Sequence, residues 1–154
     1  MSNNESIGAI IFIALIIGLV GYVGIVTYGH WQAGMAYQRD FGGFFRYADE
    51  ASDAQTKAEF FNQYVEYIEV NGLNKGCDAV FFCEQPQADL ALKYKSLKSI
   101  QNRLNELKLL DEKDTAYQLG MTQITENEFE TFPIDAFRQA YFLEHGYWGL
   151  ALTP

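Results

Sequence analysis

One stretch near the N-terminus constrains this chain more than any other feature. No Asp, Glu, Lys or Arg occurs between Glu5 and Arg39, and residues 7–28 are almost wholly apolar. These 22 residues match the roughly 20 that an α-helix needs to cross about 30 Å of hydrocarbon. The sequence therefore predicts a short tail over residues 1–6 and a single transmembrane helix over residues 7–28.

A cleaved signal peptide is the main alternative to a retained membrane helix. Such a peptide begins with basic residues and has a shorter apolar core. The chain starts Met-Ser-Asn-Asn-Glu, without Lys or Arg, and its apolar stretch is longer than a signal core. We therefore expect a single-pass protein whose N-terminal helix remains in the lipid bilayer.

Small residues recur at helical spacing inside the predicted span, at Ala14, Gly18, Gly21 and Gly24. In lipid, helix association depends on close packing, and small residues allow another helix to approach. We interpret these four positions as a packing face for other integral membrane subunits. The alternative is that glycine is simply frequent in membrane helices.

Composition describes the rest of the chain as a folded, acidic domain. Apolar residues make up 49% of the sequence and aromatic residues 16%, which is the opposite of a disordered composition. The net charge is −9, with 11 basic residues spread among 20 acidic ones. Nucleic acid is therefore an unsuitable partner, because a phosphate backbone requires clustered Lys and Arg.

Residues 29–43 are expected to connect the membrane helix to the domain, and Gly42-Gly43 favours a break or kink in this connection. The pattern of residues 44–128 predicts an antiparallel helical hairpin. Apolar residues alternate at spacings of three and four in both arms, which is typical of coiled-coil-like packing. The arms are separated by a loop over residues 71–87, and helix formers such as Lys and Glu fill the outer face. The first seam is Phe44, Tyr47, Ala51, Ala54, Ala58, Phe61, Val65 and Ile68, and the second is Leu90, Tyr94, Leu97, Ile100, Leu104, Leu107 and Leu110.

Folding the two arms about this loop predicts a register in which Ala54 lies opposite Leu104 and Phe61 opposite Leu97. A shorter, broken bundle is the alternative, because the acidic residues around Asp111 and Asp114 are suitable for starting a new helix. Either way, the predicted fold class is all-α.

The last segment, residues 129–154, is rich in aromatic residues. Pro133 and Gly146 favour a short helix between them. A small hairpin has little room to bury so many rings, so we expect contact with a partner subunit or the membrane interface. The alternative is that the segment packs as core. The expected contact residues are Phe132, Phe137, Tyr141, Phe142, Tyr147 and Trp148.

The orientation of the chain in the membrane depends on two opposing observations. Arg39 and Arg46 follow the span and nothing basic precedes it, which favours a cytoplasmic domain. Cys77 and Cys83, the only two cysteines, lie in the predicted loop and suggest a disulfide, which needs an oxidising compartment. Two buried thiols are the alternative. We give the cysteines more weight and expect an extracytoplasmic (periplasmic or extracellular) domain.

No catalytic, cofactor-binding or metal-binding motif is recognisable. His30 and His145 lack a third ligand at a diagnostic spacing. We therefore expect a non-catalytic accessory subunit, without cofactor or metal, that packs in and on a larger membrane protein complex. The alternative is a ligand-sensing or tethering ectodomain that acts as a homodimer through a partner. Its architecture would be similar to that of the sensing domains of bacterial chemoreceptors.

Overall fold

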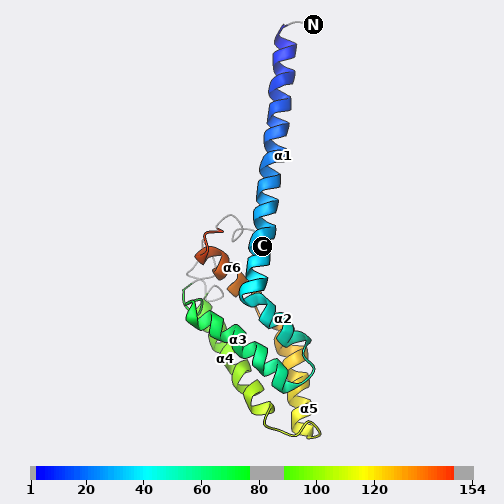
Figure 1. Ribbon diagram of the computed structural model, residues 1–154, viewed down its shortest axis with the longest axis vertical. Helices are drawn as coiled ribbons and strands as arrows, with labels where there is room; N and C mark the ends of the chain where they lie inside the picture. The colour runs from blue at the N-terminus through cyan, green and yellow to red at the C-terminus, as the bar shows by residue number, and fades with distance from the viewer. Residues whose placement is uncertain (1–2, 77–88, 148–154) are drawn as a thin grey trace. The chain divides into compact units, whose positions relative to one another are not determined.

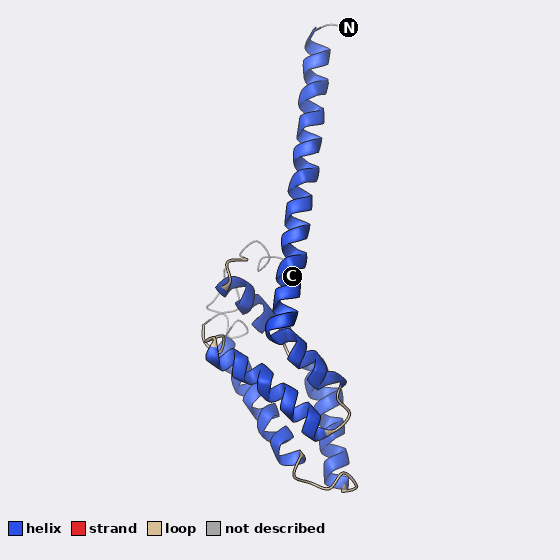
Figure 2. Ribbon diagram, viewed as in Figure 1, coloured by secondary structure: helices blue, strands red, loops and turns tan. Residues whose placement is uncertain are grey.

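The structure is a computed structural model that describes residues 3–76 and 89–147, with side chains from Phe12 onward. The regular elements in this part of the chain are all helical (Figure 2), which confirms the all-α prediction. The chain divides into two units, Met1–Gly34 and Met35–Pro154, which we call unit 1 and unit 2.

Unit 1 is formed by helix α1 (Asn3–Tyr37), whose last residues from Met35 belong to unit 2. The helix extends past the predicted span of residues 7–28 at both ends. Within the described residues, the chain has one helical stretch that is long and apolar enough to cross a membrane, and it begins in α1. This finding agrees with the prediction of one membrane helix.

Unit 2 is a bundle of short helices. A π-helical turn, η1 (Gln38–Gly42), leads into α2 (Gly43–Glu50), and α3 (Ala54–Val70) and α4 (Leu90–Leu107) follow. The chain then forms α5 (Thr115–Thr122), a second π-helical segment η3 (Gln123–Phe129), and α6 (Ile134–Glu144). Helix α3 packs against α2 on one side and against α4 on the other (Figure 1).

The prediction of an unbroken first arm is wrong, because the chain leaves the helix at Ala51–Asp53. Ala51 has an extended backbone with ψ 134°. The carboxylate of Asp53 accepts a 2.7 Å hydrogen bond from the backbone N–H of Thr56 and so caps the start of α3. An Asp at this position satisfies one of the free N–H groups of the first turn, which stabilises a new helix start over a continuous helix.

The second arm is interrupted in the same way. Helix α4 ends at Leu107, and Asp114 caps α5 by accepting a 2.9 Å hydrogen bond from the N–H of Ala116. The broken bundle that the acidic residues suggested is therefore the observed one. The predicted start of the loop at residue 71 and the predicted helix end at Gly146 are confirmed, since Gly72 and Gly146 adopt φ values of +69° and +76° just after α3 and α6.

The pairing of α3 with α4 differs from the predicted register. The predicted alignment places Asn62 opposite Ser96. In the structure, Oδ1 of Asn62 instead accepts a 2.8 Å hydrogen bond from Nε2 of Gln101 and a 3.3 Å hydrogen bond from Nδ2 of Asn105. The register is thus shifted by about one heptad. Seven residues are close to two helical turns, so the same faces still meet.

Most of the predicted seam residues are buried. These are the seam residues from Ala54 to Ile68 in α3, and Leu90, Leu97, Ile100, Leu104 and Leu107 in α4. The prediction fails in α2, where Phe45 and Ala48 point inward while Tyr47 is 46% exposed. The break at Ala51–Asp53 separates α2 from α3. The two helices therefore do not share one continuous seam, and the inward positions of α2 differ by one from those predicted for an unbroken arm.

Candidate functional site

The first candidate surface is the apolar part of α1. Every side chain from Phe12 to Tyr28 is exposed in this structure. A Cβ atom added at Gly18, Gly21 or Gly24 would meet nothing within 4 Å. Helix α1 therefore offers an open strip of backbone, as the predicted packing face requires. Ala14, the fourth predicted residue of this face, is exposed as well.

The second candidate feature is the junction between α1 and α2, which contains the π turn η1. The backbone N–H of Gly43 bonds to the carbonyl of Gln38, five residues earlier, which is the π-helical pattern. A Cβ at Gly42 would lie 2.2 Å from the ring of Tyr37, and one at Gly43 would lie 2.6 Å from the Gln38 carbonyl oxygen. Both glycines are thus required for this turn. The predicted break or kink at Gly42-Gly43 corresponds to a π turn between two helices that follow each other without a loop.

The π turn places Asp40 and Phe41 against the C-terminal helix. The hydroxyl of Tyr141 in α6 donates a 2.7 Å hydrogen bond to Oδ2 of Asp40. Burial, and then this hydrogen bond to a carboxylate, raise the pKa of Tyr141, so the phenol stays protonated as a donor. The ring of Phe41 stacks on Tyr67 at a centroid distance of 4.5 Å and on Tyr64 at 5.2 Å.

These contacts change the interpretation of the C-terminal aromatic residues. Phe132, Phe137, Tyr141 and Phe142 are at most 8% exposed within unit 2. Phe137 packs edge-on to Tyr64, and Phe132 stacks on Phe45. These four positions are therefore core and not exposed surface, because their rings pack against residues of η1, α2 and α3. Tyr147 is half-buried, and Trp148 lies outside the described residues.

Sequence reasoning missed the most unusual residue of unit 2, Lys57. Its side chain is fully buried, although the pattern placed it on the outer face. The ammonium Nζ donates hydrogen bonds to the carbonyls of Ala48, at 2.7 Å, and Asp49, at 3.0 Å, and lies 4.6 Å from the ring centre of Phe129. Burial lowers the pKa of Lys57, while the carboxylates of Asp49 and Asp53 oppose this shift. Lys57 thus neutralises the C-terminal end of α2.

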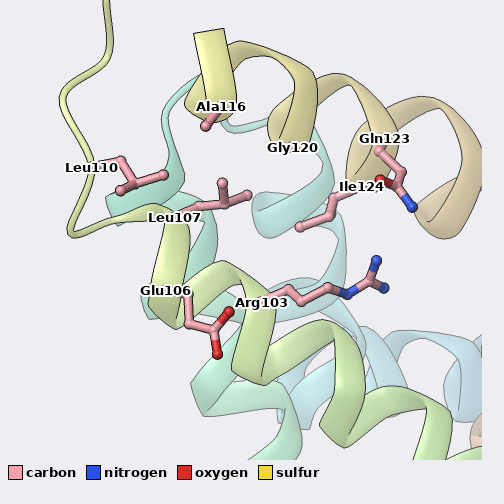
Figure 3. A pocket seen from close by; sticks show the side chains of 8 residues that line it. All are labelled: Arg103, Glu106, Leu107, Leu110, Ala116, Gly120, Gln123 and Ile124. Carbon is pink, nitrogen blue, oxygen red and sulfur yellow. The ribbon is translucent and has the colours of Figure 1, made fainter. Parts of the chain in front are cut away.

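A hollow of about 370 Å³ lies between α4 and α5 (Figure 3). Apolar side chains of both helices form its walls, and Arg103 and Gln123 supply polar groups. A shallower hollow of about 310 Å³ lies on the α3 face, between Phe44, Tyr67 and the 77% exposed Val70. Neither hollow was expected from the sequence, because neither follows from a motif.

Two further pairs of residues were considered in the sequence. Cys77 and Cys83, the predicted disulfide, lie outside the described residues. The two histidines do not form a site in the described part of the chain. His30 is exposed on α1, whereas His145 stacks on Tyr141 at 4.0 Å. Among the described residues, no group of three or more His, Cys, Asp and Glu side chains is arranged to hold a metal ion.

No protein-family model, no curated protein and no solved structure matches this chain.

Proposed function

We propose that this chain is a non-catalytic, single-pass accessory subunit of a larger membrane protein complex. The observation that carries the proposal is the open glycine face of α1. Gly18, Gly21 and Gly24 leave space for a neighbouring backbone. Glycine weakens a helix relative to alanine, whereas close packing between membrane helices benefits from it. The proposed neighbours are helices of other integral membrane subunits, with lipid covering the rest of α1.

The surface of unit 2 also supports a subunit role. Its aromatic rings are largely used to build its own core, so it resembles a rigid domain attached to an anchor. Exposed apolar residues remain at Tyr47, Val70 and Leu119, and such residues are suitable for contacting a partner's external surface. As part of the same proposal, unit 2 lies on the extracytoplasmic side, where Cys77 and Cys83 would form a disulfide.

The experiment is purification of the tagged full-length chain from its native membrane in mild detergent. We expect larger integral subunits to co-purify in a fixed ratio. Gly21→Leu should abolish this co-purification, because the added side chain blocks the glycine face. Val23→Leu is the matched control. It introduces the same residue about 200° around the helix, at a position that is also exposed, and should leave the complex intact.

Two results would count against the subunit proposal. Recovery of a clean homodimer whose melting temperature depends on a ligand would favour the sensing alternative. Equal co-purification of the Gly21→Leu and Val23→Leu variants would show that the glycine face is not where partners bind.

A further inference from the structure

Helix α3 carries a second, largely apolar seam on its outer side. Spacings of three, four and three, which are typical of an a/d seam, separate Phe60, Gln63, Tyr67 and Val70. Phe60 and Tyr67 are half-buried, whereas Val70 is 77% exposed. The inward residues of the same helix, from Ala54 to Ile68, already build the core of unit 2. The outer seam is therefore only partly covered and is available to a further helix.

Helix α2 forms the second wall beside this seam. Phe44 lines the hollow of about 310 Å³ together with Tyr67 and Val70. One turn further along α2, the ring of Tyr47 lies 5.4 Å from that of Phe60 and is 46% exposed. We call this surface the α2–α3 groove. Between positions 60 and 70 it extends about 15 Å along α3, which matches about three turns of a partner helix.

The outer edge of the α2–α3 groove is acidic. Glu59 and Glu66 each precede an aromatic seam residue by one position and are exposed. Neither forms an ion pair with another residue that the structure describes. On the α2 side, Arg46 lies 3.9 Å from Glu50, so those two charges compensate each other. In heptad packing, charged residues that flank the seam determine which partner binds, and here they require a basic one.

We infer that the α2–α3 groove binds an amphipathic helix of another protein, with Lys or Arg facing Glu59 and Glu66. The apolar residues of that helix, one turn apart, would pack on Phe60, Tyr67 and Val70. A second copy of this chain is unsuitable, because it would bring the same two carboxylates and a net charge of −9 to the groove. The inference rests on the subunit proposal, since it names the chemistry of the partner that unit 2 contacts.

The test is photo-crosslinking of the full-length chain in its native membrane. The photoreactive residue p-benzoylphenylalanine is incorporated in place of Gln63, in the middle of the groove. The control carries it in place of Asn102, at an exposed position of α4. We expect position 63 to crosslink to one segment of another protein, identified by mass spectrometry. That segment should have apolar residues at helical spacing and Lys or Arg beside them, and position 102 should not capture it.

Two pairs of variants then test the charges and the apolar seam. Glu59→Lys combined with Glu66→Lys should lower the crosslinking yield by about tenfold, because attraction becomes repulsion. Glu106→Lys combined with Glu112→Lys makes the same change in net charge at exposed positions elsewhere and should change the yield little. Val70→Ser should lower the yield by about fivefold. Leu109→Ser is its control, since Leu109 is 79% exposed and Val70 77%.

Several results would overturn the groove as a partner site. These are the absence of a crosslink from position 63, a crosslink to a second copy of this chain, or a captured segment without flanking basic residues. Equal yields for a variant pair and its control would also overturn it. The subunit proposal fails separately. If the larger subunits co-purify with the wild type but position 63 captures none of them, the subunit role stands and the groove is not where they bind.

Discussion

Lys57 holds three parts of unit 2 together with one side chain. Its ammonium satisfies two carbonyls at the end of α2, its backbone belongs to α3, and Phe129 of η3 covers the charge. The last carbonyls of a helix carry partial negative charge and lack partners within the helix. A buried cation at that point is therefore compensated, and its four-carbon stem packs in the core.

Replacing Lys57 with Met should destabilise unit 2. The substitution keeps an unbranched apolar stem but leaves the carbonyls of Ala48 and Asp49 without their donor. We expect a loss of about 1–3 kcal/mol, measured as a lower midpoint in chemical denaturation followed by circular dichroism. Lys95→Met, at an exposed position of α4, is the control and should change stability little. Equal midpoints for the two variants would show that the buried ammonium contributes nothing.

Asp53 makes the start of α3 sensitive to acid. The hydrogen bond from the N–H of Thr56 lowers the pKa of this carboxyl below its ordinary value of 3.8. Its contribution to stability is therefore present above that value and is lost as the pH falls through the lowered pKa.

Two variants separate the cap of Asp53 from its charge. Asp53→Ala should cost about 1 kcal/mol at neutral pH, because the capping oxygen is gone. Asp53→Asn keeps an oxygen acceptor that does not titrate. Its stability relative to the wild type should rise as the pH falls below 3.8. Parallel stability curves for wild type and Asp53→Asn across this acid range would contradict the assignment.

At the scale of elements, the helices of unit 2 are defined by their ends more than by their seams. Asp53, Asp89 and Asp114 each accept a hydrogen bond from a first-turn N–H and so begin α3, α4 and α5. Asp53 and Asp114 lie where an apolar pattern would otherwise continue, and they divide it. The polar residues Asn62, Gln101 and Asn105 then select the register between α3 and α4, because any other alignment would leave half-buried amides unpaired.

A double-mutant cycle distinguishes the two registers. We expect Asn62→Asp and Gln101→Lys to show a favourable coupling of about 0.3–1 kcal/mol, the usual size for a partly exposed ion pair. The same Asp combined with Ser96→Lys should show no coupling, although Ser96 is its partner in the register predicted from the seams. Coupling to position 96 instead of 101 would restore that earlier alignment. The measurement is the unfolding free energy of the wild type, the singles and the doubles.

At the scale of the whole molecule, the chain divides into an apolar helix with exposed side chains and a unit with its own core. Unit 2 buries rings from both ends of its sequence, such as Phe41 of η1 and Tyr141 of α6, which lie 5.6 Å apart. A contact between residues so distant in the sequence makes the C-terminal helix part of the folding unit.

Truncation after Phe132 should therefore unfold unit 2, since it removes Phe137 and Tyr141 from the core. The milder variant Phe137→Ala should cost about 3–5 kcal/mol, because this side chain is fully buried. Leu119→Ala, at a residue that is 67% exposed, is the control and should cost little. If the truncated chain kept a cooperative thermal transition by circular dichroism, α6 would be an appended segment and not core.

The sequence by itself determined the apolar helix, the all-helical class and the inward faces of α3 and α4. Each of these follows from local hydrophobic periodicity, which depends only on neighbouring residues. The tertiary structure decided the breaks at Ala51–Asp53 and after Leu107, the one-heptad shift, the burial of Lys57 and the packing of α6. Those features depend on which residues, distant in the sequence, donate to a backbone carbonyl, bond to a side-chain amide or pack against an aromatic ring. A seven-residue repeat fits itself equally well at successive heptads, so only the polar pairs and the aromatic core distinguish one arrangement from the next.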